Sequence, residues 1–181
     1  MENSTAGKLL IATPKLVDPN FARTVVYMAV HDENGALGVI LNRPIREVSA
    51  AEHLPAWAEF LAAPTVMFQG GPVEPIAAIG LGRWLPDSAD EGGETVGIVN
   101  LNDGPEAVPG TLRTLRVFLG YAGWGAEQLE GEIAEGAWFV VDALPDDPFR
   151  EEVESLWRDV LRRQHNQLAM FAWYPVNPSL N

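Results

Sequence analysis

The chain contains no cysteine. Without thiols it can form neither a disulfide nor a thiolate nucleophile or thiolate metal site. It also has no apolar run near the roughly 18 residues that a membrane-spanning helix requires. Its first residues have neither the basic region nor the apolar core of a signal peptide. We therefore expect a soluble cytoplasmic protein that does not act at a membrane.

Basic residues are scarce as well. The 181 residues include 12 lysines and arginines against 25 acidic residues, a formal net charge of −13. A protein that holds DNA unaided gains affinity by placing cations against phosphates. The one basic cluster (Arg158, Arg162, Arg163) lies at the end of an expected acidic helix, where cations favour the helix dipole. The charge thus disfavours nucleic acid as a partner, and solubility alone explains the acidity.

The motifs of common catalytic and cofactor sites are also missing. The sequence has no G-x-S-x-G, no P-loop, no helix-opening G-x-G-x-x-G and no H-E-x-x-H. Its three histidines, His31, His53 and His165, are too dispersed in the chain to indicate a zinc site. The sequence therefore gives no reason to expect a catalytic set, a metal or a cofactor.

Turn and strand patterns indicate the fold class. The length and a hydrophobic content of 47% favour a single globular domain over residues 1–181. A β-branched run at 24–30, an Asn-Gly turn and a second run at 36–41 predict a β-hairpin. Further strands are expected at 9–13, 66–68, 76–82 (pairing with 66–68), 95–101 and 137–141, while 112–119 fits a strand or a helix. Since strands predominate, we expect an α+β domain with a mainly antiparallel sheet.

Helices are expected in four places. Ser49 and Glu52 have the spacing of a capping box, and 55–62 follows as a second short helix. Leu129 and Ile133 share a helical face that ends near Gly136. Asp147-Pro148 has the pattern of a helix start, and an apolar stripe follows it from Phe149 to Leu161.

Two segments place polar residues where a ligand could meet them. Asp18 and Arg23 flank a turn at 18–21 that Asp18 can cap. They could form a structural ion pair, or Arg23 could grip an anion through its planar donors. Asn42 and Arg43 end a strand, where an amide suits a ligand or a turn equally.

Two glycine-rich segments are further candidates. Gly70 and Gly71 end a strand, where paired glycines let backbone N–H groups approach a ligand but more often make a tight turn. Tyr121 and Trp124 lie among three glycines before an expected helix. They could line a small-anion pocket at the helix N-terminus, or they could simply fill the core.

The same segments carry a family resemblance. The run from Gly7 to Pro44, FQGGPV at 68–73 and the block at 118–138 resemble, in order, three hallmarks of the YqgE/AlgH family. The ending at 174–181 is similar to actinobacterial members. The resemblance implies one α+β domain with a strongly curved sheet that approaches a barrel and helices packed outside it. It implies no settled activity, although one branch is named for a role in regulating alginate synthesis, as a transcriptional regulator.

This chain departs from the family pattern at two places. Glu127 stands where the family usually has glycine before Gln-Leu-Glu, which counts against a pocket that needs close backbone approach there. Ile79-Gly80-Leu81 occupies a stretch where many members have a histidine, so no role for such a histidine carries over.

Three hypotheses of function follow. The leading one is a module that binds an unknown protein or small molecule, and regulation is one role it could serve. It would have neither catalytic activity nor direct contact with DNA. Its candidate ligand-binding residues are Asp18, Arg23, His31, Asn42, Arg43, Gly70, Gly71, Tyr121 and Trp124. The first alternative is a small-molecule enzyme, such as a hydrolase, with Asp18 or His31 as general base, although His31 could instead cap the hairpin turn. The second is a transcriptional regulator that binds DNA directly.

Overall fold

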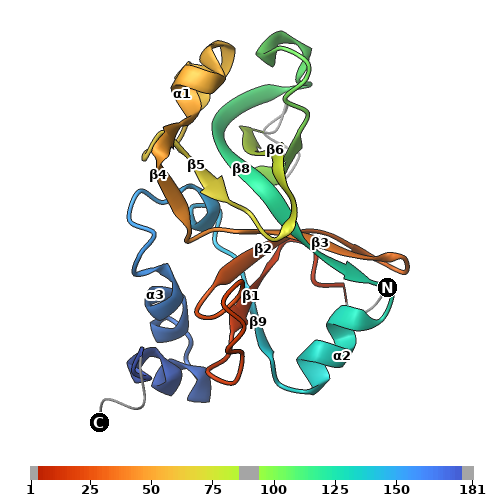
Figure 1. Ribbon diagram of the computed structural model, residues 1–181, viewed down its shortest axis with the longest axis vertical. Helices are drawn as coiled ribbons and strands as arrows, with labels where there is room; N and C mark the ends of the chain where they lie inside the picture. The colour runs from red at the N-terminus through yellow and green to blue at the C-terminus, as the bar shows by residue number, and fades with distance from the viewer. Residues whose placement is uncertain (1–3, 86–93, 177–181) are drawn as a thin grey trace.

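One long, curved strand, β8 (Thr111–Gly125), organises the computed structural model, which describes residues 4–85 and 94–176 (Figure 1). Most of its length pairs with β6 (Val73–Leu85), and its C-terminal end pairs with β3 (Gly35–Ile40). The other strands of the nine-stranded sheet are β1 (Lys8–Ala12), β2 (Val25–Asp32), β4 (Pro44–Ser49), β5 (Val66–Gln69), β7 (Thr95–Val99) and β9 (Trp138–Asp142).

The sheet is mixed and mainly antiparallel. Its order is β4-β5-β8-β3-β2-β1-β9, with β6 on β8 and β7 on β6, and among the described strands only β5 and β8 pair in parallel. Few helices accompany it, in keeping with an α+β fold. Within the described ranges no pairing joins β9 to β4, so the expected approach to a barrel is not confirmed. The expected pairing of 76–82 with 66–68 is wrong, because β6 pairs with β8 and β7 instead.

Local sequence accounts well for the hairpin of β2 and β3. The strands pair antiparallel from Val26 opposite Ile40 to Asp32 opposite Gly35, as predicted. The ambiguous segment 112–119 is a strand, and it lies inside β8. This strand continues through the glycine-rich block at 120–125, where it pairs with β3.

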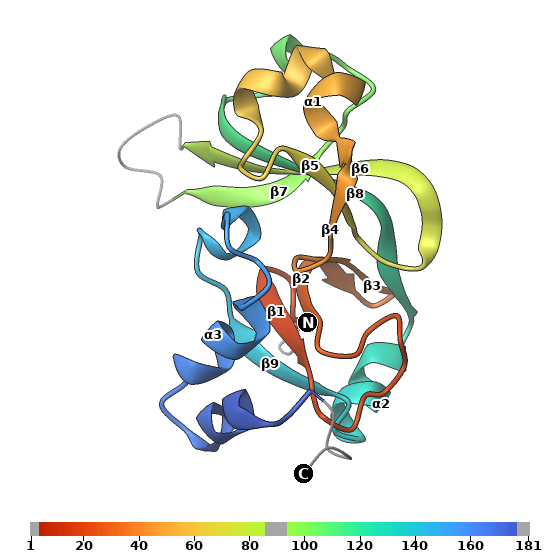
Figure 2. The same ribbon diagram turned by 60° about the vertical axis from the view of Figure 1, so that its left-hand side comes forward.

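The helical segments cover the sheet at three places (Figure 2). At one end, Ser49 caps α1 (Ala50–His53) by accepting from the Glu52 N–H, as predicted, and a 3₁₀ helix, η1 (Pro55–Phe60), follows. Near β1 and β9 lie α3 (Leu156–Arg162) and the 3₁₀ helix η4 (Gln167–Trp173), with α2 (Gln128–Ala134) on the other side of these strands. Two single 3₁₀ turns are η2 (Pro105–Ala107) and η3 (Asp147–Phe149). None of the helices in the described part of the chain has the length and apolarity needed to cross a bilayer.

The prediction of a long helix that starts at Asp147 is wrong. Only η3 forms there, and α3 begins at Leu156. The backbone becomes extended at Arg150, where ψ is 142°. Arg116, a buried residue of β8, holds the segment in this form, because its guanidinium donates to the carbonyl oxygens of Pro148 at 3.1 Å and Arg150 at 2.8 Å. Burial lowers the pKa of Arg116 to about 10, and the guanidinium still meets three backbone carbonyls and the Phe68 ring.

Candidate functional site

The segment between β1 and β2 is held by its own backbone turn. The Asp18 carboxylate accepts from the Asn20 N–H at 2.8 Å, and the Thr24 hydroxyl donates to the Phe21 carbonyl at 2.7 Å. The predicted Asx turn is therefore confirmed. The expected Asp18–Arg23 ion pair is absent from the salt bridges of the described residues. Asp18 interacts instead with Arg43. Burial lowers the pKa of Arg43, and the negative charge of Asp18 offsets part of this decrease.

Asn42 and Arg43 anchor this segment to the end of β3. The Asn42 amide accepts from the Val25 N–H at 3.0 Å and donates to the Arg23 carbonyl at 2.9 Å. Arg43 donates to the carbonyl of Pro19 at 2.8 Å. Because these groups are engaged with backbone, both residues position the segment, and Asn42 in particular fixes the backbone of Arg23.

Arg23 reaches a concave surface. Its backbone is in the left-handed region, with φ of 58°. Its guanidinium lies 4.0 Å from the centre of the Trp157 ring and donates to the Tyr174 carbonyl at 3.1 Å. A positive φ is costly for a non-glycine residue and persists only where the surroundings enforce it. Here Asn42 does so, and the side chain is thereby aimed at α3 and the C-terminal segment.

Two adjoining hollows meet at Arg23 and Trp157, and we call them together the Arg23 groove. The first, of about 350 Å³, is the more polar, and the second, of about 420 Å³, is largely apolar. The first is lined by Arg23, Asn42, Glu154, Ser155, Trp157, Arg158 and Val176. The second is lined by Thr13, Pro14, Leu16, Val17, Ala22, Arg23, Trp157, Tyr174, Pro175 and Val176.

The polar part of the groove is cationic in a strongly acidic chain. The pKa of Arg23 lies below its ordinary value, chiefly because burial removes part of its hydration and also because Arg158 adds a like charge nearby. The one carboxylate in the lining, Glu154, is already paired with Arg46. An anion that entered the groove would therefore meet two guanidinium groups that lie close to each other.

Gly70, Gly71 and Tyr121 lie where two strands cross closely. A Cβ on Gly70 would lie 2.2 Å from the Gly120 carbonyl oxygen, and one on Gly71 would lie 2.1 Å from the Tyr121 carbonyl carbon. The Gly70 N–H donates to Leu119 at 2.8 Å and its carbonyl accepts from Ile40 at 2.9 Å. The glycines thus let the turn between β5 and β6 pass directly over β8, which favours the turn over the ligand interpretation.

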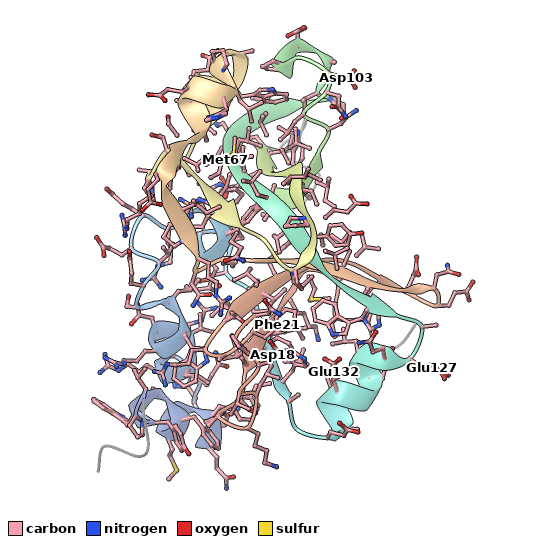
Figure 3. All side chains as sticks on the ribbon, in the orientation of Figure 1. Asp18, Phe21, Met67, Asp103, Glu127 and Glu132 are labelled. Atoms are coloured by element: carbon pink, nitrogen blue, oxygen red, sulfur yellow. The ribbon has the colours of Figure 1, made fainter. Side chains whose placement is uncertain are left out.

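Trp124 belongs to an aromatic cluster beside α2. It is 7% exposed, and its ring lies 6.0 Å from that of Trp138 and 6.3 Å from that of Phe21. The indole N–H groups of Trp124 and Trp138 both donate to one oxygen of Glu132, at 2.9 and 2.8 Å. In Figure 3, Glu132 points from α2 towards the sheet, and Phe21 lies on the sheet side of it. The cluster fastens α2 to the sheet, so Trp124 fills the core.

Glu127, which stands where the family pattern has glycine, has a left-handed backbone conformation. It lies at the outer end of α2 (Figure 3) and has φ of 61°. Glycine adopts this conformation without the steric cost that a Cβ brings.

We expect Glu127→Gly to raise the free energy of unfolding by about 1 kcal/mol, because it removes this backbone strain. Chemical denaturation measures the change. Glu127→Ala is the matched control, since it removes the carboxylate but keeps the Cβ, and it should give no comparable gain. Equal gains in both variants would contradict the backbone explanation.

His31 lies apart from the Arg23 groove. Its ring is buried and bonded at both nitrogens, with Thr5 at Nδ1 and Glu130 at Nε2. The interpretation that it caps the hairpin turn is wrong, because both partners come from other segments. Among the described residues, no group of three or more His, Asp or Glu side chains is placed to share a metal ion.

The candidate residues therefore do not converge on one concavity. Of these candidates only Arg23 and Asn42 line the Arg23 groove, while Asp18 and Arg43 bond to the backbone of the turn that precedes Arg23. Gly70, Gly71, Tyr121, Trp124 and His31 lie elsewhere in the fold. Sequence analysis missed Trp157 and Arg158, which the groove requires. Their signal was confined to the apolar stripe and basic cluster of the last helix, and neither pattern indicates what they face.

Comparison with known proteins gives a consistent picture. The model of a family described as AlgH-like matches residues 9–169. A UPF0301 protein of Streptomyces avermitilis is 48% identical, over 99% of this chain and 96% of its own. A UPF0301 protein of Thermobifida fusca is 44% identical, over 98% and 96% of the two chains.

Two solved structures share the fold. The crystal structure of protein DIP2367 from Corynebacterium diphtheriae superimposes with a TM-score of 0.80, at 29% identity, over 94% of this chain and 92% of that one. The solution structure of the AlgH protein from Pseudomonas aeruginosa gives a TM-score of 0.65 at 27% identity, over 98% and 100% of the two chains. Neither description states a ligand or a reaction.

Proposed function

Since the chain belongs to the AlgH-like family, whose activity is uncharacterised, we propose from its own geometry that it is a binding module for an extended peptide segment bearing a carboxylate. The observation that carries this proposal is Arg23, held in a strained conformation with its guanidinium on the Trp157 ring in a groove. Strained residues persist where the surrounding structure enforces them, often at ligand sites.

The charges of the groove support an anionic ligand. Arg23 and Arg158 lie close enough for one to lower the pKa of the other. A carboxylate between them would relieve this repulsion and accept charge-assisted hydrogen bonds, which are stronger than neutral ones. The same charges, two cations in a chain of net charge −13, are too few to neutralise a duplex. This favours a protein segment over DNA as the partner.

The chain's own C-terminal segment supports a peptide rather than a small molecule. Tyr174 has an extended backbone, and its carbonyl accepts from Arg23 at 3.1 Å. Pro175 and Val176 continue along the apolar hollow. An extended, proline-containing stretch of backbone therefore forms one wall of the groove and Trp157 forms another. Aromatic-lined grooves are used to recognise proline-containing peptides.

Exposed apolar side chains extend the groove on both sides. Val17 is 82% exposed and Val176 is 76% exposed, and both line the apolar hollow. Apolar surface that is rimmed by charge commonly marks an interaction site. A peptide could bury these side chains while its carboxylate meets the arginines.

The first test is a titration with a fluorescently labelled peptide, Asp-Tyr-Pro-Val-Asp, followed by anisotropy. We expect Arg23→Asn to weaken binding by about 10- to 100-fold, because charged hydrogen bonds contribute about 1.5–3 kcal/mol. Asparagine tolerates the left-handed conformation, so the fold should persist. The reference peptide with both acids changed to amides should bind the unaltered chain as weakly as the acidic peptide binds the variant.

Arg113→Asn is the matched control for net charge. Arg113 is an exposed arginine of β8, outside the groove lining. This variant should bind the acidic peptide within about twofold of the unaltered chain, since isolated surface charges contribute little. Equal losses in both arginine variants would show a general charge effect and contradict a site at Arg23.

A further inference from the structure

His31 is held in one tautomer by its surroundings. Its side chain is 2% exposed, and Nδ1 lies 3.0 Å from the backbone nitrogen of Thr5. A backbone N–H can only donate, so Nδ1 is unprotonated and accepts. The ring proton is then on Nε2, which donates to the Glu130 carboxylate at 2.9 Å. Thr5 and Glu130, which are 26 and 99 positions from His31 in the sequence, thus fix one tautomer of the imidazole, with its accepting nitrogen towards Thr5.

The Thr5 hydroxyl lies where that nitrogen can remove its proton. Thr5 Oγ1 is 2.9 Å from His31 Nδ1, within the range for a nucleophile and its general base. The carboxylate of Glu130 on the opposite nitrogen would stabilise the imidazolium that forms. Hydroxyl, imidazole and carboxylate in this order are the elements of nucleophilic acyl-transfer sites, which are recognised by geometry rather than by position in sequence.

A hollow of about 370 Å³ opens beside these groups. Thr5, His31 and Glu130 all line it. Ile133 and Val140 give it an apolar wall, and Lys8 adds a cation. The hollow thus combines a nucleophile and its base with room for a small acyl chain and a positively charged side chain in its lining.

We propose that Thr5 accepts an acyl group from an activated carboxylic ester, with His31 as general base and Glu130 as a positioning residue. The Thr5 oxygen bonds to the acyl carbon as the proton of its hydroxyl moves to His31 Nδ1. The bond from that carbon to the leaving oxygen then breaks, and the proton passes to the departing alcohol. Protonation of Nδ1 also frees the Thr5 N–H to donate to the oxyanion. Water attacks the acyl-threonine by the same route, releasing the acid and restoring Thr5.

The site is separate from the Arg23 groove, so the two proposals are tested independently. Incubation of the full chain with p-nitrophenyl acetate, followed by intact and peptide mass spectrometry, should show one acetyl group on Thr5. Thr5→Val should abolish this modification, while Thr5→Ser should retain it. Thr24→Val is the matched control, because Thr24 is a buried threonine whose hydroxyl donates to Phe21 and faces no imidazole.

His31→Gln should slow acetylation of Thr5 by about 100-fold, the lower range for general-base catalysis. Glu130→Gln should slow it less, and nitrophenol release should fall in parallel with the labelling. Peptide mapping of the unaltered chain needs no variant, so a folding defect cannot obscure the answer. Acetyl groups only on Lys8, Lys15 or the N-terminus would overturn the proposal, and so would the absence of a label on Thr5 together with nitrophenol release that Thr5→Val leaves unchanged.

Discussion

Replacing Gly71 with alanine should prevent the chain from accumulating as folded protein. The new Cβ would lie 2.1 Å from the carbonyl carbon and 2.2 Å from the carbonyl oxygen of Tyr121. Both are backbone atoms of β8, which also pairs with β3, β5 and β6. The clash cannot be relieved by a side-chain rotation and must break the crossing. We expect a loss above about 4 kcal/mol, a large part of the 5–15 kcal/mol that stabilises a typical domain.

Soluble yield and chemical denaturation measure this effect. Gly131→Ala is the matched control, because a Cβ at Gly131, inside α2, meets nothing within 4 Å. It should raise the free energy of unfolding by about 0.5–1 kcal/mol, since alanine is the better helix former. If Gly71→Ala unfolded at the same denaturant concentration as the unaltered chain, the strand crossing would have been assigned wrongly.

Replacing Arg163 with glutamine should lower the free energy of unfolding by about 3 kcal/mol, the lower end of the cost of breaking a buried ion pair, because the Arg163 side chain is itself 26% exposed. The Asp147 side chain is 2% exposed, and each of its oxygens accepts from Arg163 at 2.6 Å. One oxygen also accepts from the Leu144 N–H at 2.7 Å. Without Arg163, a buried carboxylate would lose its counter-ion and most of its hydrogen bonds.

Arg46→Gln is the control for this prediction. Arg46 also pairs with a carboxylate, Glu154, but the two side chains are 61% and 55% exposed. Such surface pairs contribute at most about 1 kcal/mol. The double variant Arg163→Gln with Asp147→Asn should recover part of the loss, because no buried charge remains. Similar unfolding midpoints for the Arg163 and Arg46 variants would contradict the buried-pair explanation.

Elements whose residues contact each other locally could be predicted from the sequence. The hairpin of β2 and β3 and the cap of α1 form because turn chemistry and strand patterns agree over a few residues. The helix expected from Asp147 failed for the opposite reason. Arg116, more than 30 positions away, binds the carbonyls of Pro148 and Arg150, where the backbone leaves the helical conformation. A strand residue that reaches across the core leaves no mark in the periodicity of the segment it interrupts.

The candidate site could be predicted only in part for the same reason. Arg23 and Asn42 stand out because polar side chains end a turn and a strand close together in sequence. Trp157 comes from a helix more than 130 positions further on, and it shows only an apolar pattern until the fold sets it under Arg23. His31 was singled out as a possible base, but its partners Thr5 and Glu130 carry no motif. Their relation exists only in three dimensions.

The most direct test of the central claim, that the Arg23 groove holds a carboxylate-bearing peptide, is to follow the six tryptophan side chains by NMR during the peptide titration. Trp157 lies under Arg23, whereas Trp57 and Trp84 belong to the apolar cluster near α1 and η1, at the other end of the sheet (Figure 1). We expect the Trp157 indole signal to shift progressively with the acidic peptide, while those of Trp57 and Trp84 stay in place. Shifts confined to Trp57 or Trp84, or no shift at saturating peptide, would contradict it.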